Sequence, residues 1–267
     1  MKKLSIIIAI LMLCSCVSNP FTGKSTMAFV NNSQLFPSSF AQYDEFLSEN
    51  SVISGTADAE MVARVGERLA NAAQKWLASE GHSHYLDDYR WEYKLVQDNA
   101  VNAWCMPGGK IVVYTGILPV TKTEEALAVV LGHEISHALL NHGQQRMSAG
   151  VLQEIGAVGI SLMTINQSPE SQALAMTAYG AGSNLFGTLP FSRGHESEAD
   201  HYGLILMAIA GYNPDEAVPF WQRMAALGGG GTPEFLSTHP SDETRIRQLQ
   251  GWVPEAKRKA AGFGVEF

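Results

Sequence analysis

Apolar residues recur every three or four positions from Asp58 to Leu77, a period that predicts an amphipathic helix of about five turns. Two later segments, "RWEYKLVQD" and "KIVVYTGIL", instead alternate in the manner of β-strands and are rich in β-branched and aromatic residues. The intervening stretch ends in Pro107-Gly108-Gly109, which predicts a turn. The first half of the chain therefore predicts a helix followed by a small sheet.

Helical patterns dominate the second half of the chain. The segment "TKTE" matches a capping box and predicts a helix that begins near Thr121 and runs to about Arg146. Further helices are predicted over residues 194–210, after an N-cap at Asn213, and, as a short final helix, in "SDETRIRQLQ". The pattern as a whole predicts an α+β protein that is predominantly helical.

Residues 151–189 are rich in glycine, alanine and larger apolar residues. Their two apolar segments each fall short of the roughly 20 residues that span a bilayer, and Gln153, Glu154 and Asn184 would be costly within one. We therefore expect buried helices that wrap or cover a cleft, in preference to a membrane hairpin.

Composition and charge narrow the class of protein. The chain has 267 residues, 46% of them hydrophobic, which is enough for one large globular domain or two small ones. It carries 18 Lys and Arg against 26 Asp and Glu, a net charge of −8. Because binding to phosphates requires clustered cations, a nucleic-acid partner is not expected.

The N-terminus, "MKKLSIIIAILMLCSC", has two lysines, an apolar run and then small residues. This order predicts a secretory signal peptide over residues 1–15. The ending "LCSC" resembles a bacterial lipobox, which predicts cleavage before Cys16 and acylation of that cysteine. The alternative is ordinary secretion, with Cys16 as a plain thiol. We expect a lipid-anchored protein on the periplasmic face of the bacterial cell envelope, and Val17 in place of an aspartate favours the outer membrane.

The remaining chain divides by composition. Residues 16–57, rich in Ser, Asn, Thr, Gly and Pro, are interpreted as the lipidated N-terminus and a tether; residues 58–252 as the main domain; and residues 253–267 as a C-terminal tail. Cys105 is then the one cysteine of the mature domain, so no intramolecular disulfide is expected. We interpret it as a small buried apolar residue.

The segment "HEISH" carries the candidate chemistry. One helical turn is 3.6 residues, so His133 and His137 lie on one face of a helix, and Glu134 lies one position round from the first. Two histidines four apart with an adjacent glutamate are typical of a zinc site in which the glutamate acts on a metal-bound water.

A catalytic zinc needs a third protein ligand and an open position. The metzincin motif requires a histidine at 143, where the chain has Gly143, so that class does not fit. A glutamate on a later helix is the remaining common solution. Glu196 could ligate zinc, while Asp200, four residues on, accepts a hydrogen bond from a ligand imidazole.

Taken together, four sequence features resemble the CAAX prenyl protease-type zinc metallopeptidases, particularly their soluble bacterial lipoprotein members (HtpX-, LoiP- and BepA-like). The features are HExxH at 133–137, the ExxxD motif at 196–200 with Ser192-Arg193 before it, "NAWCMPGG" upstream and "THP" downstream. The resemblance implies a gluzincin-type domain with a small sheet packed on the HExxH helix. It also implies one Zn²⁺ per chain, bound by His133, His137 and Glu196, with Glu134 as the catalytic carboxylate.

Two further residues are candidates for the reaction. His239, in the "THP" segment, is interpreted as a donor to the oxyanion that develops in the transition state. It could instead occupy the open zinc position and hold the enzyme inactive, or lie in a surface loop without contacts. Arg193 is expected to pair with a carboxylate near the site. His142 is expected to cap or solvate the end of its helix.

Peptide binding requires an extended backbone partner. The segment "GGKIVVYTG" could be an edge strand that accepts a substrate strand, with Asn102 and Gly109 lining the cleft. Alternatively, "IVVY" belongs to the core.

The function expected from these features is a membrane-anchored zinc endopeptidase that hydrolyses envelope proteins, with misfolded or unassembled proteins as the substrate class implied by the resemblance. Two alternatives are a chaperone-like periplasmic assembly factor that binds polypeptides with little proteolysis, and a protein with a purely structural zinc. The sequence gives no oligomeric state.

Overall fold

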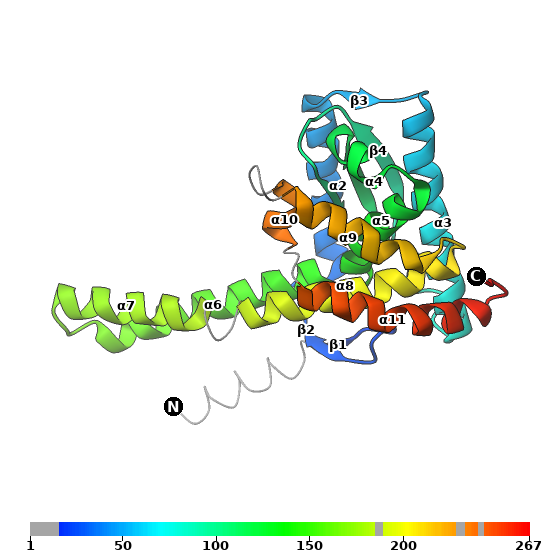
Figure 1. Cartoon of the computed structure of the whole chain (residues 1–267). Helices are drawn as coiled ribbons and strands as arrows, with labels where there is room; N and C mark the ends of the chain where they lie inside the picture. The colour runs from blue at the N-terminus through cyan, green and yellow to red at the C-terminus, as the bar shows by residue number, and fades with distance from the viewer. Residues whose placement is uncertain (1–15, 185–188, 228–232, 240–242) are drawn as a thin grey trace.

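The computed structural model describes residues 16–184, 189–227, 233–239 and 243–267, so the predicted signal peptide, residues 1–15, lies outside the described residues. Helices surround a small sheet, and two long helices, α6 (His142–Thr164) and α7 (Pro169–Ser183), form an arm that projects from this body (Figure 1). The expected α+β, predominantly helical fold is confirmed.

The four-stranded sheet has the order β3-β4-β6-β5. Its strands are β3 (Val52–Ile53), β4 (Glu92–Val96), β5 (Ala103–Met106) and β6 (Lys110–Tyr114). Strands β4 and β6 are parallel, and the other neighbours are antiparallel. Strands β4 and β6 were predicted, whereas β5 lies where only a turn was expected.

The position of β6 decides between two predictions. An edge strand and a core strand were both left open for it, and it lies between β4 and β5, with Ile111, Val112 and Val113 fully buried. The core interpretation of "IVVY" is therefore confirmed, and the edge beside it is β5. The turn before β6 is as predicted, with Gly108 and Gly109 at φ of +87° and +91°, a region that favours glycine.

Helix α3 (Ala57–Ser79) confirms the first predicted helix, and its N-cap is the Thr56 side chain. Helix α5 (Glu124–Leu139) is capped by Thr123, not Thr121, because a short helix, α4 (Leu118–Thr121), precedes it after the 3₁₀ turn η1 (Thr115–Ile117). Every residue from Ala126 to Leu139 is buried, so α5 is the central helix of the body.

Helix α5 also ends earlier than the predicted Arg146. Asn141 adopts a left-handed conformation with φ of 57°, which interrupts the helix, and α6 starts in a new direction at His142. Asparagine tolerates this conformation better than most residues. The side chains of Asn19, Tyr85 and Tyr89 bond to the last carbonyls of α5, which satisfies acceptors that a helix end leaves free.

Helix α8 (Leu189–Ile209) crosses α5 at close range. A Cβ atom on Gly203 would lie 2.8 Å from the Gly132 carbonyl carbon and from the His133 amide nitrogen. Only a residue without a side chain allows the two backbones to approach this closely. The crossing brings the motif at 133–137 against the motif at 196–200.

The segment after Cys16 is folded where a tether was expected. It forms β1 (Cys16–Ser18), β2 (Ser25–Met27) and α2 (Asn32–Glu49), which buries Phe36 and Tyr43 against the body. The Ser- and Asn-rich composition concealed this helix.

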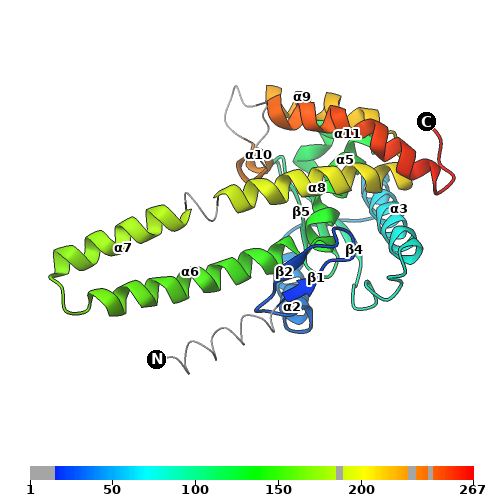
Figure 2. The ribbon, with the colours of Figure 1, turned by 90° about the horizontal axis from the view of Figure 1, so that it is seen from below.

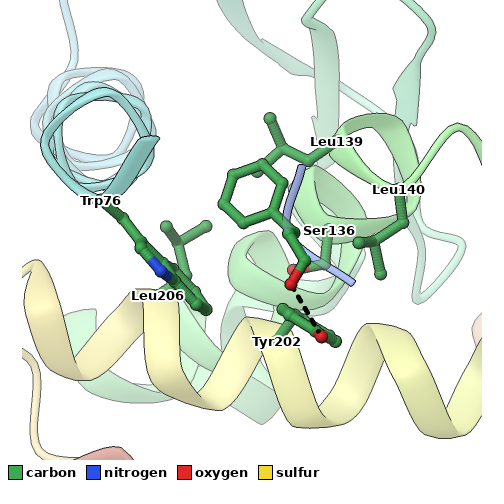
Figure 3. A pocket seen from close by; sticks show the side chains of 7 residues that line it. Trp76, Ser136, Leu139, Leu140, Tyr202 and Leu206 are labelled. Carbon is green, nitrogen blue, oxygen red and sulfur yellow. Dashed lines mark hydrogen bonds between the residues drawn. The ribbon is translucent and has the colours of Figure 1, made fainter. Parts of the chain in front are cut away.

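Between β1 and β2, Phe21 packs into a small pocket behind α5, where the hydroxyl of Tyr202 donates to its carbonyl at 3.0 Å (Figure 3). The pocket is lined, besides Phe21, by Trp76, Ser136, Leu139, Leu140, Tyr202 and Leu206.

The arm overturns the prediction that residues 151–189 form buried helices. In its described residues α7 buries none, and α6 buries only four near its start, His142, Gln144, Gln145 and Ser148 (Figure 2). The exposed apolar residues of the arm include Leu162, Met163 and Leu174. Helix α6 is long and apolar enough to cross a membrane by length and composition.

The C-terminal part covers the far side of α8. After the predicted cap at Asn213 come η3 (Pro214–Glu216) and α9 (Ala217–Ala226), then α10 (Glu234–Thr238) and α11 (Glu243–Ala261). Helix α11 is longer than the short final helix that the sequence predicted, and it runs through the boundary expected at residues 252 and 253.

Candidate metal centre

Four side chains from three helical segments meet beside the crossing of α5 and α8. The ligand atoms of His133, His137, Glu196 and His239 all lie within 4.8 Å of one another. The Nε2 atoms of His133 and His137 are 3.1 Å apart, and each lies 3.3 Å from an oxygen of Glu196. The residues that the sequence selected as metal ligands are thus brought together.

His239, which follows α10, joins this group through its Nδ1 atom. That atom lies 2.7 Å from Glu196 Oε2 and 3.0 Å from His133 Nε2. The ring is buried, so the alternative of a surface loop without contacts does not hold.

The carboxylate of Glu134 lies next to the ligand group without belonging to it. Its Oε1 atom is buried and has no hydrogen-bond partner, although His239 Nε2 is 3.3 Å away. A buried acceptor without a partner costs free energy, which such a group recovers when a water or substrate proton reaches it. Glu134 is therefore placed to accept a proton beside the ligands.

Asp200 holds the ring of His133 from the other side. Its Oδ1 atom lies 2.9 Å from His133 Nδ1 and accepts a bond of 2.6 Å from Arg245. The pKa of Asp200 is lowered, because Arg245 and His133 outweigh the opposing effect of burial. Asp200 thus orients the imidazole so that Nε2 faces the other ligands, as the sequence predicted.

The arginine at this site is Arg245 of α11, whereas Arg193 lies exposed on α8. The guanidinium of Arg245 lies over the ring of Trp221, 3.4 Å from its centroid, and donates to the carbonyl of His239 at 3.1 Å. It therefore positions both Asp200 and the backbone that carries His239. Sequence reasoning missed Arg245, because nothing in "SDETRIRQLQ" marks it.

Charge in the group is arranged to hold a cation. Burial raises the pKa of Glu196, but bonds from His133, His137 and His239 lower it far more, so Glu196 is ionised. Burial lowers the pKa of His133, yet Asp200 and Glu196 raise it to about 9. Burial lowers the pKa of His137 well below its usual value. The ionised Glu196 carboxylate and the imidazoles therefore form a group that favours a bound positive charge.

We expected His142 to cap or solvate the end of its helix, but it does neither. Its side chain is fully buried, and its Nδ1 atom lies 2.8 Å from His137 Nδ1. The prediction failed because it assumed one continuous helix, in which residues five apart lie about 140° apart around the axis.

The two residues predicted to bind substrate lie at opposite ends of β5. Asn102 precedes the strand, and its amide donates to Glu234 of α10 at 3.0 Å. Gly109 lies in the turn after it, where a side chain would collide with Trp91. Cys105, in the middle of β5, is a free thiol whose pKa is raised by burial, and it is therefore not a reactive thiolate.

Comparison with known proteins agrees with this geometry. Over 177 residues, 65% of this chain and 50% of the relative, the chain is 37% identical to mitochondrial metalloendopeptidase OMA1 of Schizosaccharomyces pombe. It is 29% identical to the Homo sapiens mitochondrial metalloendopeptidase OMA1, over 89% of this chain and 46% of the relative. It is also 29% identical to the beta-barrel assembly-enhancing protease of Escherichia coli, over 66% of this chain and 37% of the relative.

The chain spans about half the length of the curated relatives it matches, or less. The model of peptidase family M48 matches residues 57–253, which include the ligand group, Glu134, Asp200 and Arg245. Because this match covers most of the chain, the protein belongs to peptidase family M48.

Proposed function

We propose that the protein is a zinc-dependent endopeptidase in which His133, His137 and Glu196 hold one Zn²⁺ and Glu134 is the general base. The observation that carries the proposal is the buried Glu134 Oε1 atom, which has no hydrogen-bond partner and lies next to two imidazoles and a carboxylate that converge. A purely structural metal site has no use for such a group.

The donor set fits zinc. Two imidazole nitrogens and one carboxylate oxygen, with an orienting carboxylate behind one imidazole, are the ligands of many catalytic zinc sites. A zinc ion bound there would lower the pKa of a water molecule toward 7 and polarise the scissile carbonyl.

The protein's own residues then handle the proton. Glu134 takes it from the attacking water and passes it to the nitrogen of the leaving amine. Its burial keeps bulk water from competing for the same oxygen, and the fixed rotamer on α5 keeps the carboxylate beside the ligands.

His239 has a second role in this proposal. Its Nδ1 atom lies with the ligands and its Nε2 atom faces Glu134, so the ring fills the space where the water would stand. In this conformation it would complete a set of four ligands for a zinc ion, as in closed zinc sites, and the reaction would require the ring to move away. If His239 instead donates to the oxyanion, removal of its side chain should slow cleavage, whereas removal of an obstructing ring should speed it.

The substrate would extend the sheet at β5. This strand is an edge and packs beside α5, so its outer side could pair with an extended peptide. Asn102 joins the start of β5 to α10, which supports a substrate strand that lies between the sheet and the segment that carries His239.

We also propose that Cys16 carries the lipid anchor and that the protein acts at the periplasmic face of the bacterial envelope, preferentially on the outer membrane. The leader pattern supports this location. The name of the Escherichia coli relative, a beta-barrel assembly-enhancing protease, supports quality control of misfolded or unassembled envelope proteins as the role. The remaining candidate, a chaperone-like assembly factor with little proteolysis, needs the cleft but not Glu134.

The decisive experiment is digestion of casein by the Glu134→Gln variant. We expect zinc content and thermal unfolding to match the wild type, while cleavage falls roughly 100- to 10,000-fold. Glu154→Gln, an exposed glutamate on α6, is the matched control and should cleave normally. Unchanged cleavage by Glu134→Gln would remove the general base from the proposal, and suppression of substrate aggregation without any cleavage by the wild type would favour the chaperone.

His239→Ala in the same assay separates its two roles. Faster cleavage is expected if the ring obstructs the water position. A fall of roughly 100- to 1000-fold would instead assign it to the oxyanion.

A further inference from the structure

A second set of polar residues lies behind His137, on the side away from the ligand group. His142, the first residue of α6, is fully buried, and its Nδ1 atom lies 2.8 Å from His137 Nδ1. Its Nε2 atom lies 3.2 Å from Glu198 Oε2 on α8. A continuous row therefore runs from the ligand imidazole through a second imidazole to a carboxylate.

The protons of this row have one consistent arrangement. The Glu198 carboxylate can only accept, so His142 Nε2 carries the proton between them, and the neutral His142 ring has a lone pair on Nδ1. His137 Nδ1 must then carry a proton and donate it to that lone pair. The same assignment leaves His137 Nε2 unprotonated, and this is the atom that faces Glu196 and His133.

The row is held in place along its length. The ring of His195 stacks on His142, with centroids 4.0 Å apart and planes 10° apart, and its Nε2 atom lies 3.1 Å from the Gln145 amide oxygen. Glu198 forms an ion pair with Lys24, which belongs to the folded N-terminal segment. Helix α8 and the N-terminal segment, both distant from His142 in sequence, thus help to fix its ring.

This arrangement parallels the one behind the other histidine ligand. His133 is oriented directly by Asp200, which Arg245 holds. His137 has no carboxylate at its own Nδ1 atom in the described structure and reaches one through His142.

We propose that His142 is a positioning residue that, together with Glu198, fixes the tautomer and orientation of His137 for metal binding. The proposal rests on the proposed zinc site. Removal of such an outer partner typically costs 10- to 100-fold in metal affinity.

The test compares His142→Leu with His142→Gln. Leucine fills the space but cannot accept from His137, whereas the glutamine oxygen can accept from His137 and its amide can donate to Glu198. We expect His142→Leu to lower zinc affinity about 10- to 100-fold, and His142→Gln to recover most of the loss. Zinc affinity is measured by competition with a chelator, the ligand geometry by the visible spectrum of the Co²⁺ form, and folding by thermal unfolding of the metal-free protein.

Two further variants separate positioning from packing. Glu198→Ala, at a side chain that is 25% exposed, removes the acceptor without opening the core and should also weaken zinc binding. His201→Leu is the control, because this histidine of α8 also contacts a carboxylate, Glu255 at 3.0 Å, but touches no ligand. It should bind zinc as the wild type does.

The outcomes are distinct. If the wild type binds no zinc, the proposed zinc site fails. If the wild type binds zinc and both His142→Leu and Glu198→Ala bind it equally well, the positioning role is refuted while the zinc site stands. The same refutation follows if glutamine at 142 weakens binding as much as leucine does.

Discussion

Helix α5 and helix α7 are both rich in apolar residues and similar in length, yet they lie in opposite environments. Every residue of α5 from Ala126 onward is buried, whereas none of the described residues of α7 is. The difference lies in what surrounds them, because α3, α8 and β5 pack on α5 while α7 contacts mainly its partner α6. Apolar composition therefore does not determine burial. The partners that the rest of the chain supplies decide it.

This comparison assigns different tasks to the two regions. The body, where α5 and α8 cross, holds both the core and the ligand group, so changes there should affect folding and metal binding together. Beyond Ser148, the arm carries its apolar residues outside the core, so changes in that part of α6 and in α7 should leave metal binding unaffected and affect folding little. Four substitutions and one change of pH test this division.

The largest effect is expected from Glu196→Ala. Loss of a direct ligand should weaken zinc binding by more than about 100-fold, since even outer partners of a ligand are worth 10- to 100-fold. Metal content after dialysis and casein digestion measure it. Full zinc and full activity in this variant would mean that the third ligand lies elsewhere.

The matched substitution in the arm is Glu154→Ala, on the exposed part of α6. It removes a carboxylate from a helix of the same chain and should change neither metal content nor cleavage. A loss of zinc in this variant would show that the arm contributes to the metal centre, and the division between the regions would fail.

Next in size is Gly203→Ala at the helix crossing. The added methyl group would lie 2.8 Å from backbone atoms of α5, which cannot move aside cheaply. Overpacking of this kind costs about 1 to 3 kcal/mol of unfolding free energy, and here it should also displace His133 and weaken zinc binding. Chemical denaturation of the metal-free protein and chelator competition measure the two effects. Wild-type values for both would contradict the close crossing.

The dependence of zinc binding on pH should be intermediate. The pKa of His133 is raised from 6.5 to about 9, so zinc must displace its proton over this range. Zinc affinity should therefore rise by up to about tenfold per pH unit up to about pH 9. The metal-free protein should behave in the opposite way: the raised pKa contributes stability fully below pH 6.5, and that contribution is lost as the pH approaches 9. Titration calorimetry measures how zinc affinity changes with pH, and thermal unfolding measures how the stability of the metal-free protein does. If both quantities rose together with pH, the raised pKa of His133 would be contradicted.

Among the changes that should have a measurable effect, the smallest is expected from Gly159→Ala in α6. A Cβ atom at this position meets nothing within 4 Å, so alanine should stabilise the helix by at most about 1 kcal/mol and leave zinc binding unchanged. Together, the Gly159→Ala and Gly203→Ala variants compare the same substitution in the arm and in the body. A destabilised Gly159→Ala variant would reveal packing on the arm.

The sequence predicted the site better than its surroundings. The spacing of His133 and His137 follows from helix geometry, and the pair of Glu196 and Asp200 follows from the need for a third ligand and an orienting carboxylate, so local rules sufficed. The roles of His142 and Arg245 were not predicted. That of His142 depends on the left-handed conformation of Asn141, and that of Arg245 depends on how α11 packs on α8.

The fold shows the same limit. Helix α3 and strands β4 and β6 were predicted from their periodicity, but β5 lies in a segment that predicted only a turn, so the sequence could not decide between an edge and a core position for β6. The burial of the arm was predicted wrongly because an apolar helix is normally interpreted as part of the core. Whether other elements pack against it depends on the fold of the whole chain.

The docking of the N-terminal segment would limit how far the protein stands from a bilayer if the proposed acylation of Cys16 holds. Asn19 is buried and bonds to the carbonyl of Leu139 at 2.8 Å, at the end of the helix that carries the histidine ligands. Only three residue steps separate it from Cys16, a reach of about 11 Å even when fully extended. If Cys16 is acylated, the C-terminal end of α5 would lie close to the lipid headgroups. The proposed peptidase would then meet polypeptides at the membrane surface before it meets those that diffuse freely.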